Sequence, residues 1–548
     1  HLPFATAGSY FAVTSAVNTE DAGKWVELRT VRGRAATRAL LRIAPRDGLH
    51  GKAAFDIDHL VLPAAAGHVS VDFNTHRVLS VSGAGVGFEL IMEAASNYDT
   101  LVRVAEDEWR YLRFSSQVTI AIRVLRGRGI EESTWAGERH TMATLQFAPG
   151  SVVLIEETND ATPTARKPWS PPSFDVFAAA MPEVKPEHQA AKQLASYIMW
   201  SSIVEPSGAV QRPAMYMSKG TMTNVWSWDN CFNAIALAQL PELAEDQFFV
   251  PFDAQATSGR LPDSVNDKVI DYTFTKPPIH GWALMALFRA GAVNDEWLLR
   301  AYDPLQRWTQ WWLTERVASG RILPHYFHGN DSGWDNSTIF ATTVPVESPD
   351  LAAFLVLQTE ALSEIASRLS RPDEAKKWAT VSSSLLNSLL KEMWDGSRFI
   401  ARKLDSTVIE SASLLHLLPV VLGSRLPSEV FNTLVSDLGR FRTEYGLATE
   451  ATDSPAYIAD GYWRGPIWAP CTALIIDGLI DGGEEQLALD LAESLCAMAS
   501  ASGMAENFDA VTGAGLRDRA YTWTSSVFLT LAGLLAAEER TNDPCAGV

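Results

Sequence analysis

The spacing of apolar residues changes once along this 548-residue chain, and the change limits what the chain can fold into. Up to about residue 160, short β-branched runs such as 118–124 and 152–156 lie close to glycine, aspartate or asparagine, as strands of antiparallel sheets do. From about residue 185 to 540, apolar residues recur three and four positions apart, which is the period of an amphipathic helix. We therefore predict a strand-rich region followed by a larger helical one.

The boundary between the two regions is rich in proline, with Pro163, Pro168, Pro171 and Pro172 between residues 161 and 173. Proline has no backbone N–H to donate, and it restricts the residue before it, so such a stretch disfavours both helix and sheet. We predict three parts. They are an antiparallel β-sandwich domain at 1–160, a proline-rich linker at 161–184 and a helical catalytic domain at 185–540.

The helical region contains about eleven segments with helical spacing. They lie near 185–204, 228–240, 280–292, 295–317, 350–370, 373–394, 410–419, 427–439, 464–481, 484–501 and 521–538. No fixed repeat length relates them, which argues against a solenoid of the common repeat types. Many helices joined by short aromatic-rich loops suit a toroid of paired helices, although periodicity alone does not distinguish a toroid from another large all-α fold.

Composition excludes several classes of partner. The formal net charge of -20 disfavours nucleic acid and anionic membranes, since both attract basic surfaces. No run of about 18 apolar residues is present, so no membrane span is expected. The four cysteines lie far apart without a CxxC pair, and no basic region followed by an apolar run opens the chain. We therefore expect a reduced, cytoplasmic setting and no metal; the oligomeric state is not predicted.

Four short segments between the predicted helices are dense in aromatic and polar residues. They are Trp226–Phe232, Asp331–Ser337, Gly461–Trp468 and Ala505–Gly513. Asp229, in the first segment, precedes an apolar helix, and two roles for it stay open. It is either a helix N-cap, worth about 1 kcal/mol, or a carboxylate that binds sugar hydroxyls between two tryptophans.

In the second segment, composition does not separate Asp331 from Asp335 as the working carboxylate, since both stand among turn-forming residues. Asp335 follows a tryptophan, whose ring would desolvate the carboxyl and raise its pKa, as a general acid requires. In the third segment, Arg464 has the plainer alternative of an ion pair with a nearby acid. In the fourth, Glu506 taken alone is more typical of a solvated surface residue.

Taken together, the segments indicate glycoside hydrolysis. That reaction needs one carboxyl group to protonate the leaving oxygen and a second to activate water or attack carbon. Asp335 and Glu506 supply two carboxyl groups in separate loops that are rich in aromatic residues. The chain also has 18 tryptophans, whose faces stack on the apolar faces of sugar rings as well as packing in cores.

At these residues the chain resembles the (α/α)6-barrel glycosidases grouped around glycoside hydrolase family 63. That group includes the processing α-glucosidases, the trehalases of family 37 and the bacterial mannosylglycerate and glucosylglycerate hydrolases. The matching pieces are Trp228–Asp229, Ser332–Ser337, Tyr462–Trp468 and Glu506–Gly513, in the family's order over roughly residues 185–540. The resemblance implies an (α/α)6 toroid preceded by the β-sandwich, a small carbohydrate substrate and no cofactor.

The resemblance also implies roles for individual residues. Asp335 matches the family's general acid and Glu506 its general base, in a reaction that inverts the anomeric carbon. Inversion requires the two carboxyl groups to lie roughly 6.5–9.5 Å apart. The residues that match or flank the subsite for the cleaved sugar are Trp226, Trp228, Asp229, Asn230, Trp334, Asn336, Tyr462, Trp463, Arg464, Trp468, Asn507 and Trp523.

Two stretches depart from the family pattern. After Glu506 the chain has Asn-Phe-Asp where many relatives have a tyrosine, which would reshape the rim of the pocket. Lys276 begins a Lys-Pro-Pro-Ile-His sequence where relatives often have Gln-Pro-Pro, so Lys276 and His280 join the candidate binding residues. A lysine at this position would favour an anionic leaving group, and the alternative is a solvated lysine before a helix.

These observations favour an inverting, exo-acting α-glycosidase, with an α-glucosidase acting on a small α-glucoside or oligosaccharide as the main interpretation. The alternatives within the same class are a glucosylglycerate or mannosylglycerate hydrolase and an α-L-rhamnosidase. From another class, the chain would be a non-catalytic carbohydrate-binding protein. The presence of both Asp335 and Glu506 argues against that last interpretation, because binding alone needs no acid and base.

Overall fold

The computed structural model describes residues 2–15, 23–33, 39–137, 139–158 and 169–542. It divides into two compact units. One is sheet-rich and comprises His1–Phe177, Tyr197–Asn224 and Asn266–Val269; the other is helical and comprises the remainder. Part of the predicted linker, with Pro163 and Pro168, lies outside the described residues, and a short helix, α1 (Phe174–Ala179), occupies part of the rest.

The sheet-rich unit contains two antiparallel sheets. In the first, the strands run in the order β1 (Phe11–Ser15), β2 (Val26–Thr30), β3 (Ala39–Pro45), β8 (Phe88–Glu93), β13 (Arg139–Phe147) and β12 (Gly129–Ala136). In the second, the order is β4 (Ala54–Phe55), β5 (His59–Pro63), β6 (His68–Thr75), β7 (Val78–Ala84), β14 (Val152–Glu157), β11 (Val118–Arg126), β10 (Glu108–Arg113) and β9 (Thr100–Ala105). The antiparallel pairing predicted from the sequence is therefore found.

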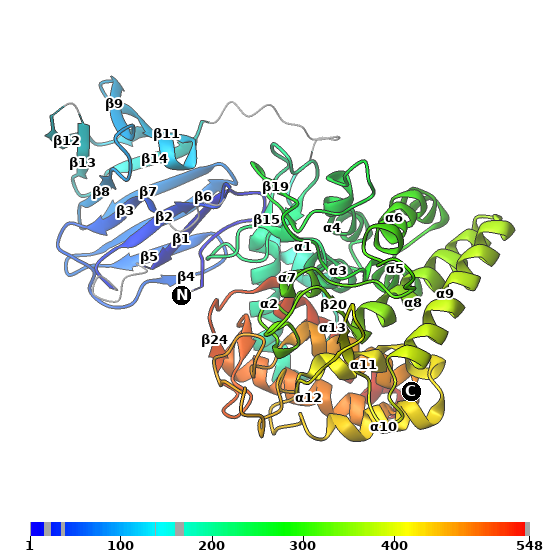
Figure 1. The fold of residues 1–548 in the computed structure, drawn as a ribbon. Coiled ribbons are helices and arrows are strands. Elements are labelled where there is room, and N and C mark those ends of the chain that lie inside the picture. The colour runs from blue at the N-terminus through cyan, green and yellow to red at the C-terminus, as the bar shows by residue number, and fades with distance from the viewer. Residues whose placement is uncertain (1, 16–22, 34–38, 138, 159–168, 543–548) are drawn as a thin grey trace. The chain divides into compact units, whose positions relative to one another are not determined.

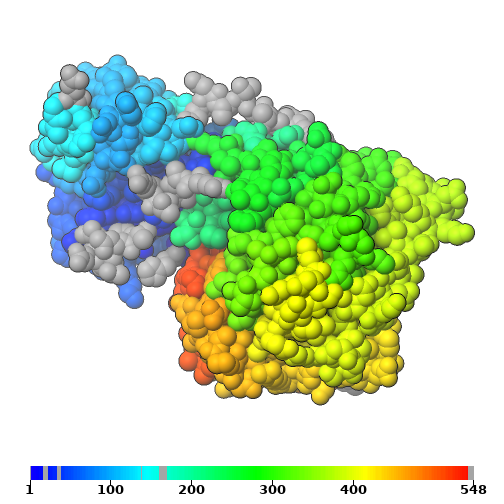
Figure 2. Space-filling view, viewed as in Figure 1, coloured from blue at the N-terminus to red at the C-terminus, as the bar shows by residue number. Residues whose placement is uncertain are grey.

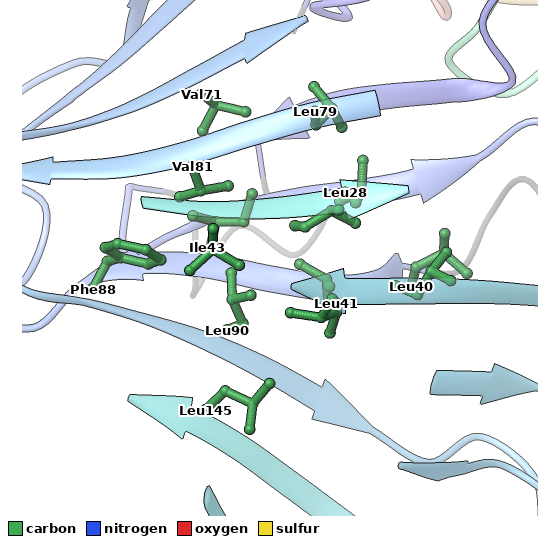
Figure 3. Close-up of a cluster of buried hydrophobic side chains, with 14 of the residues drawn as sticks. Leu28, Leu40, Leu41, Ile43, Val71, Leu79, Val81, Phe88, Leu90 and Leu145 are labelled. Carbon is green, nitrogen blue, oxygen red and sulfur yellow. The ribbon is translucent and has the colours of Figure 1, made fainter. Parts of the chain in front are cut away.

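The two sheets share one apolar core. Along β7, buried and partly exposed residues alternate, because successive side chains of a strand point to opposite faces. Inward-facing residues from both sheets, among them Leu41, Leu90 and Val81, belong to a single buried cluster. Figure 3 shows these side chains gathered between the strands. Apolar side chains at alternate positions of both sheets are buried together, and this burial stabilises the packing of one sheet on the other.

The helices of the chain fall close to the segments with helical spacing. They are α2 (Gln189–Ser202), α3 (Asp229–Ala236), α4 (Pro241–Asp253), α5 (His280–Arg289), α6 (Asp295–Glu315), α7 (Gly329–Ser332), α8 (Pro349–Arg368), α9 (Pro372–Glu392), the 3-10 helix η4 (Leu414–Arg425), α10 (Ser428–Leu438), α11 (Ala469–Asp481), α12 (Glu485–Ser502) and α13 (Thr522–Asn542). Two of these helices, α4 and the four-residue α7, lie outside the predicted segments. The residues of α4 from Gln247 to Phe252 are all buried, so α4 has no clear polar face, and it contains Pro251.

Six of these elements close a ring in the helical unit. Each packs against the next in the order α3, α5, α8, η4, α11 and α13, and α13 packs against α3 again. Figure 1 labels the five α-helices among them. Other helices pack on members of the ring: α4 on α3, α6 and α9 on α8, α10 on η4, and α12 on α11 and α13. Figure 2 shows the yellow-green tip of the α8–α9 hairpin projecting from the surface.

The ring explains how distant segments reach one place. The four aromatic-rich segments and Lys276 all precede ring helices: Trp226–Trp228 precedes α3, Lys276 precedes α5, Asp335 precedes α8, Gly461–Trp468 precedes α11 and Glu506 precedes α13. Each of these segments is therefore at or before the N-terminal end of a ring helix. These N-terminal connections are where a site is to be sought.

Two chain-wide expectations can be compared with the structure. Cys231, Cys471 and Cys496 are buried free thiols, and Cys545 lies outside the described residues. Among the residues that are described, none of the helices has both the length and the apolarity that a bilayer crossing requires.

Candidate active site

Asp331 and Asp335, which the sequence does not separate, have different surroundings. Asp331 is buried, and its Oδ2 accepts hydrogen bonds from Arg316 at 2.7 Å and from the backbone N–H of Phe327 at 2.9 Å. Its Oδ1 accepts from the N–H of Thr275 at 3.1 Å. These bonds occupy both oxygens of Asp331 and give it a structural role.

The Asp335 carboxyl is not held in this way. Within the described ranges, no hydrogen bond or ion pair joins it to another residue. Burial raises its pKa above the ordinary aspartate value, and the nearby positive charge of Lys276 opposes that rise. A desolvated carboxyl that the protein leaves without a partner is suited to donate a proton to a substrate.

Glu506 is the second desolvated carboxyl group. Only 5% of the residue is exposed, and its backbone N–H donates to the carbonyl of Asp518 at 2.8 Å. Burial raises its pKa to about 7, with a contribution from the charge of Asp518, while Arg517 and a hydrogen bond from Tyr462 oppose the rise. A carboxyl that titrates near neutrality exchanges protons readily at physiological pH.

Tyr462 connects the two carboxyl groups. After burial, the causes that raise the pKa of its phenol are the charges of Asp335, Glu506 and Asp229, in that order. Asp335 and Glu506 come from the connections before α8 and α13, and Asp229 begins α3. The predicted acid, the predicted base and the predicted sugar-binding Asp229 therefore all act on one phenol.

Lys276 supplies a fixed positive charge to the same cluster. Its Nζ lies 2.7 Å from Oδ1 of Asp263 and donates to the carbonyl of Asn330 at 2.7 Å. Asp335 and Asp229 also raise its pKa, so one buried ammonium stands among three carboxylates. The alternative of a solvated lysine is wrong. Lys276 is only 5% exposed because the ion pair and the carbonyl offset the cost of burying its charge.

Asp229 does not cap its helix. The N-cap of α3 is Trp228, whose side chain makes no capping hydrogen bond, and Asp229 is the first helical residue. Burial raises the pKa of Asp229 well above its ordinary value, and Lys276 is the main opposing influence. The N-cap interpretation of Asp229 is therefore wrong, and its carboxyl belongs to the buried charged cluster.

Five of the predicted tryptophans form one cluster. Trp463 and Trp468 stack with ring centroids 4.0 Å apart, and Trp334 lies 4.9 Å from Trp463. Trp523 lies 5.3 Å from Trp468 and 5.8 Å from Trp228. These rings exclude water from the neighbouring carboxyl groups, which strengthens electrostatic interactions there.

Other predicted residues hold the loops and helices in place. Asn230 donates to the carbonyl of Gln247 on α4 at 3.0 Å, and Arg464 donates to the carbonyl of Ala456 at 3.2 Å. Asn336 bonds to the backbone of the Gly461–Trp468 segment on both sides of Tyr462. These three side chains contact protein backbone, and among the described residues no salt bridge of Arg464 with an acid is found.

Three further predicted residues have distinct surroundings. His280 has no exposed surface, its ring packs against Phe252 and Phe248, and burial lowers its pKa to about 3. This is the setting of a neutral core residue. Asn507 is fully buried and Trp226 is half-buried in the short strand β17 (Val225–Trp226).

Several residues of this cluster are not among the predicted site residues. Asp263 stands in a short turn-like stretch with no aromatic neighbour, so nothing in its local sequence marks it. Tyr521 begins the Tyr-Thr-Trp segment that contains Trp523, and the charge of Glu506 helps raise its pKa. Arg517 lies with its guanidinium 4.9 Å from the Tyr462 ring centroid.

Within the ranges described, no group of three or more His, Cys, Asp or Glu side chains could hold a metal ion.

Comparison with known proteins agrees with this arrangement. A family model described as the mannosylglycerate hydrolase MGH1-like glycoside hydrolase domain matches residues 222–524. A mannosylglycerate hydrolase of Rubrobacter radiotolerans is 22% identical over 401 residues, which cover 56% of this chain and 89% of that protein. A glucosylglycerate hydrolase of Mycolicibacterium hassiacum is 23% identical over 426 residues, which cover 57% and 94%.

Solved structures show the same fold. The glycoside hydrolase family 63 mannosylglycerate hydrolase from Thermus thermophilus, in complex with glucose, aligns with a TM-score of 0.53 and 21% identity over 61% of this chain and 98% of its own. A bacterial glucoamylase complexed with acarbose aligns with a TM-score of 0.62 and 11% identity over 98% of this chain and 94% of its own. At these identities the likeness concerns the fold alone.

The matched region contains all four aromatic-rich segments and extends over more than half of the 548 residues. The resemblance to family 63 drawn from those segments is confirmed. The chain belongs to the MGH1-like family of glycoside hydrolases and is itself a glycoside hydrolase.

Proposed function

We propose that this protein is an inverting, exo-acting hydrolase of a small α-glycoside, with Asp335 as general acid and Glu506 as general base. One observation carries the proposal. Two buried carboxyl groups with raised pKa values both raise the pKa of the same phenol, Tyr462, whose ring packs against Trp463 and Trp468. Asp335 protonates the glycosidic oxygen while Glu506 removes a proton from the water that attacks the opposite face of the sugar.

We also propose that the helical unit is an (α/α)6 barrel. The closed ring of α3, α5, α8, η4, α11 and α13, with further helices packed on its members, supports this arrangement. The barrel gives the reaction its geometry, since the acid and the base belong to loops that enter different ring helices. Binding of the sugar among the tryptophans would orient it between the two carboxyl groups.

A glycosylglycerate is the substrate that the relatives favour. Two relatives are named as a mannosylglycerate and a glucosylglycerate hydrolase, and they match over most of their own length. This supports the alternative over the main interpretation of the sequence, which is an α-glucosidase. Among charged groups, Lys276 has the largest effect on the pKa of Asp335, the predicted acid. We therefore assign Lys276 to binding an anionic leaving group.

A neutral α-glucoside is the second candidate, and the charge of the site favours it. Lys276 is already paired with Asp263, and Asp229, Asp335 and Glu506 add further negative charge to the same cluster. These carboxylates would repel an anionic substrate. Binding of glycerate glycosides should therefore weaken with salt only if Lys276 contacts the carboxylate directly.

The test is proton NMR of the purified protein with glucosylglycerate, mannosylglycerate and a panel of α-linked glucose disaccharides, recording the first anomer released. Initial release of a β-anomer from one α-linked substrate would establish the sugar, the linkage and inversion together. Initial release of the α-anomer would mean retention and would remove Glu506 from its role as water-activating base. Turnover confined to the disaccharides would select the neutral substrate.

A further inference from the structure

The backbone of Tyr462 adopts a conformation that residues other than glycine rarely take. Its φ is 64°, in the left-handed region. Among the described residues, the non-glycine residues with positive φ are Gln117, Ser370, Ser406, Tyr462 and Arg517. Two of these five, Tyr462 and Arg517, face each other at the candidate site. Strained backbone persists only where its surroundings enforce it, and it concentrates at functional sites.

The surroundings that enforce it come from the residue after the predicted acid. The Asn336 side chain accepts a hydrogen bond from the N–H of Trp463 and donates one to the carbonyl of Gly461, each at 2.9 Å. It therefore binds the peptide groups on both sides of Tyr462. The indole of Trp468 donates to the carbonyl of Tyr462 itself at 2.9 Å, so three hydrogen bonds fix this one strained residue.

The other end of Tyr462 reaches the predicted base. As a hydrogen-bond donor its hydroxyl lowers the pKa of Glu506, and the guanidinium of Arg517 lies over its ring, 4.9 Å from the centroid. The chain of contacts therefore runs from the loop of Asp335, through Asn336 and Tyr462, to Glu506. The sequence alone assigns Asn336 and Tyr462 to substrate binding, and these contacts give them a different role.

We propose that Asn336 and Tyr462 form a strut that sets the spacing between Asp335 and Glu506. Both are positioning residues: Asn336 holds the backbone of Tyr462, and Tyr462 orients the Glu506 carboxyl. Inversion depends on such a device, because the two carboxyl groups must leave room for one water, and small displacements of reacting groups are costly. The inference rests on the proposed function, in which Glu506 is the general base.

Tyr462→Phe is the first variant, since it removes only the hydroxyl. We expect kcat to fall by roughly 100-fold while KM changes little, because the base is misplaced and the sugar contacts remain. Loss of the donor raises the pKa of Glu506, so the acidic limb of the kcat profile moves up by about one pH unit. Tyr302→Phe is the matched control. It removes a tyrosine hydroxyl that donates to Glu374 at 2.7 Å, and this hydrogen bond lies outside the cluster.

Asn336→Ala tests the other half of the strut. It should reproduce the fall in kcat and the shift of the acidic limb, and the double variant with Tyr462→Phe should lose little more than the worse single variant. Asn387→Ala, on the exposed side of α9, is the control and should leave activity unchanged. Thermal unfolding of each variant checks that it is folded.

A direct measurement keeps the test independent of any substrate. In protein labelled with 13C at the glutamate carboxyl, the resonance absent from Glu506→Gln reports the titration of Glu506, and Tyr462→Phe should raise its midpoint. An unchanged midpoint, or a raised KM with unchanged kcat, would overturn the strut and return Tyr462 to substrate binding. Full activity in Glu506→Gln would instead overturn the proposed function.

Discussion

Gly333 lies directly against the indole ring of Trp228, and a Cβ built on Gly333 would approach that ring to 2.4 Å. Its φ of 74° is also in the region that favours glycine. We expect Gly333→Ala to push the Trp228 ring out of place, to lower stability by about 1–3 kcal/mol and to reduce kcat. Differential scanning calorimetry and steady-state kinetics measure the two effects.

The matched control is Gly320→Ala, where φ is 76° but no atom lies within 4 Å of the added Cβ. It carries the same backbone strain without the clash. The difference between the two variants therefore isolates the contact with Trp228, and equal effects in both would mean that this contact is unimportant.

Asp331 and Asp335 should respond oppositely to the same substitution. Asp335→Asn removes the proposed acid and should lower kcat by roughly 10²-fold or more at nearly unchanged melting temperature. Asp331→Asn breaks a buried ion pair with Arg316 and should cost about 3 kcal/mol of stability. Melting temperatures and kcat values of both variants decide between the two aspartates, and the reverse pattern would exchange their roles.

The pKa of Glu506 makes stability depend on pH. Because burial raises the folded-state pKa to about 7, the protonated form is favoured in the folded protein. The stabilising contribution of protonated Glu506 is fully present below the unfolded-state pKa and is lost as pH rises through 7. Glu506→Gln stays neutral, so we expect it to be more stable than the wild type at about pH 8, by up to about 3 kcal/mol, and similar at about pH 4. Urea unfolding at the two pH values measures the difference.

His280 should show the opposite dependence. Its folded-state pKa of about 3 lies below the ordinary histidine value, so the unfolded chain binds the proton more readily. The neutral form stabilises the fold above the unfolded-state pKa, and this contribution is lost as pH falls toward 3. His280→Phe should therefore flatten the loss of stability in acid and keep KM unchanged. A large rise in KM would instead support the sequence-based assignment of His280 to the substrate.

Much of the fold was predictable from periodicity. The helical spacing over 295–317 corresponds to α6, and the spacing over 373–394 corresponds to α9, because each helix buries one face and leaves the other polar. The helix α4 lacks such a pattern over its buried C-terminal half. The order in which the ring closes has no local signal at all, since it depends on which helices pack together.

The candidate site was predictable only in part. The aromatic segments around Asp335 and Glu506 carry enough local composition to be noticed, whereas Asp263 has none and enters the site through its ion pair with Lys276. Asp331 and Asp335 share the same local composition, and they differ because Arg316 reaches one and not the other. Such differences arise from tertiary contacts, which no short stretch of sequence encodes.

The N-terminus of α3 has an electrostatic consequence for Asp229, its first residue. A helix carries roughly half a positive elementary charge at its N-terminus, and the effect falls off within the first turn. The backbone of α3 therefore contributes positive potential beside the Asp229 carboxyl group. This potential comes from peptide groups and not from side chains, so neighbouring side chains can be exchanged while it is kept.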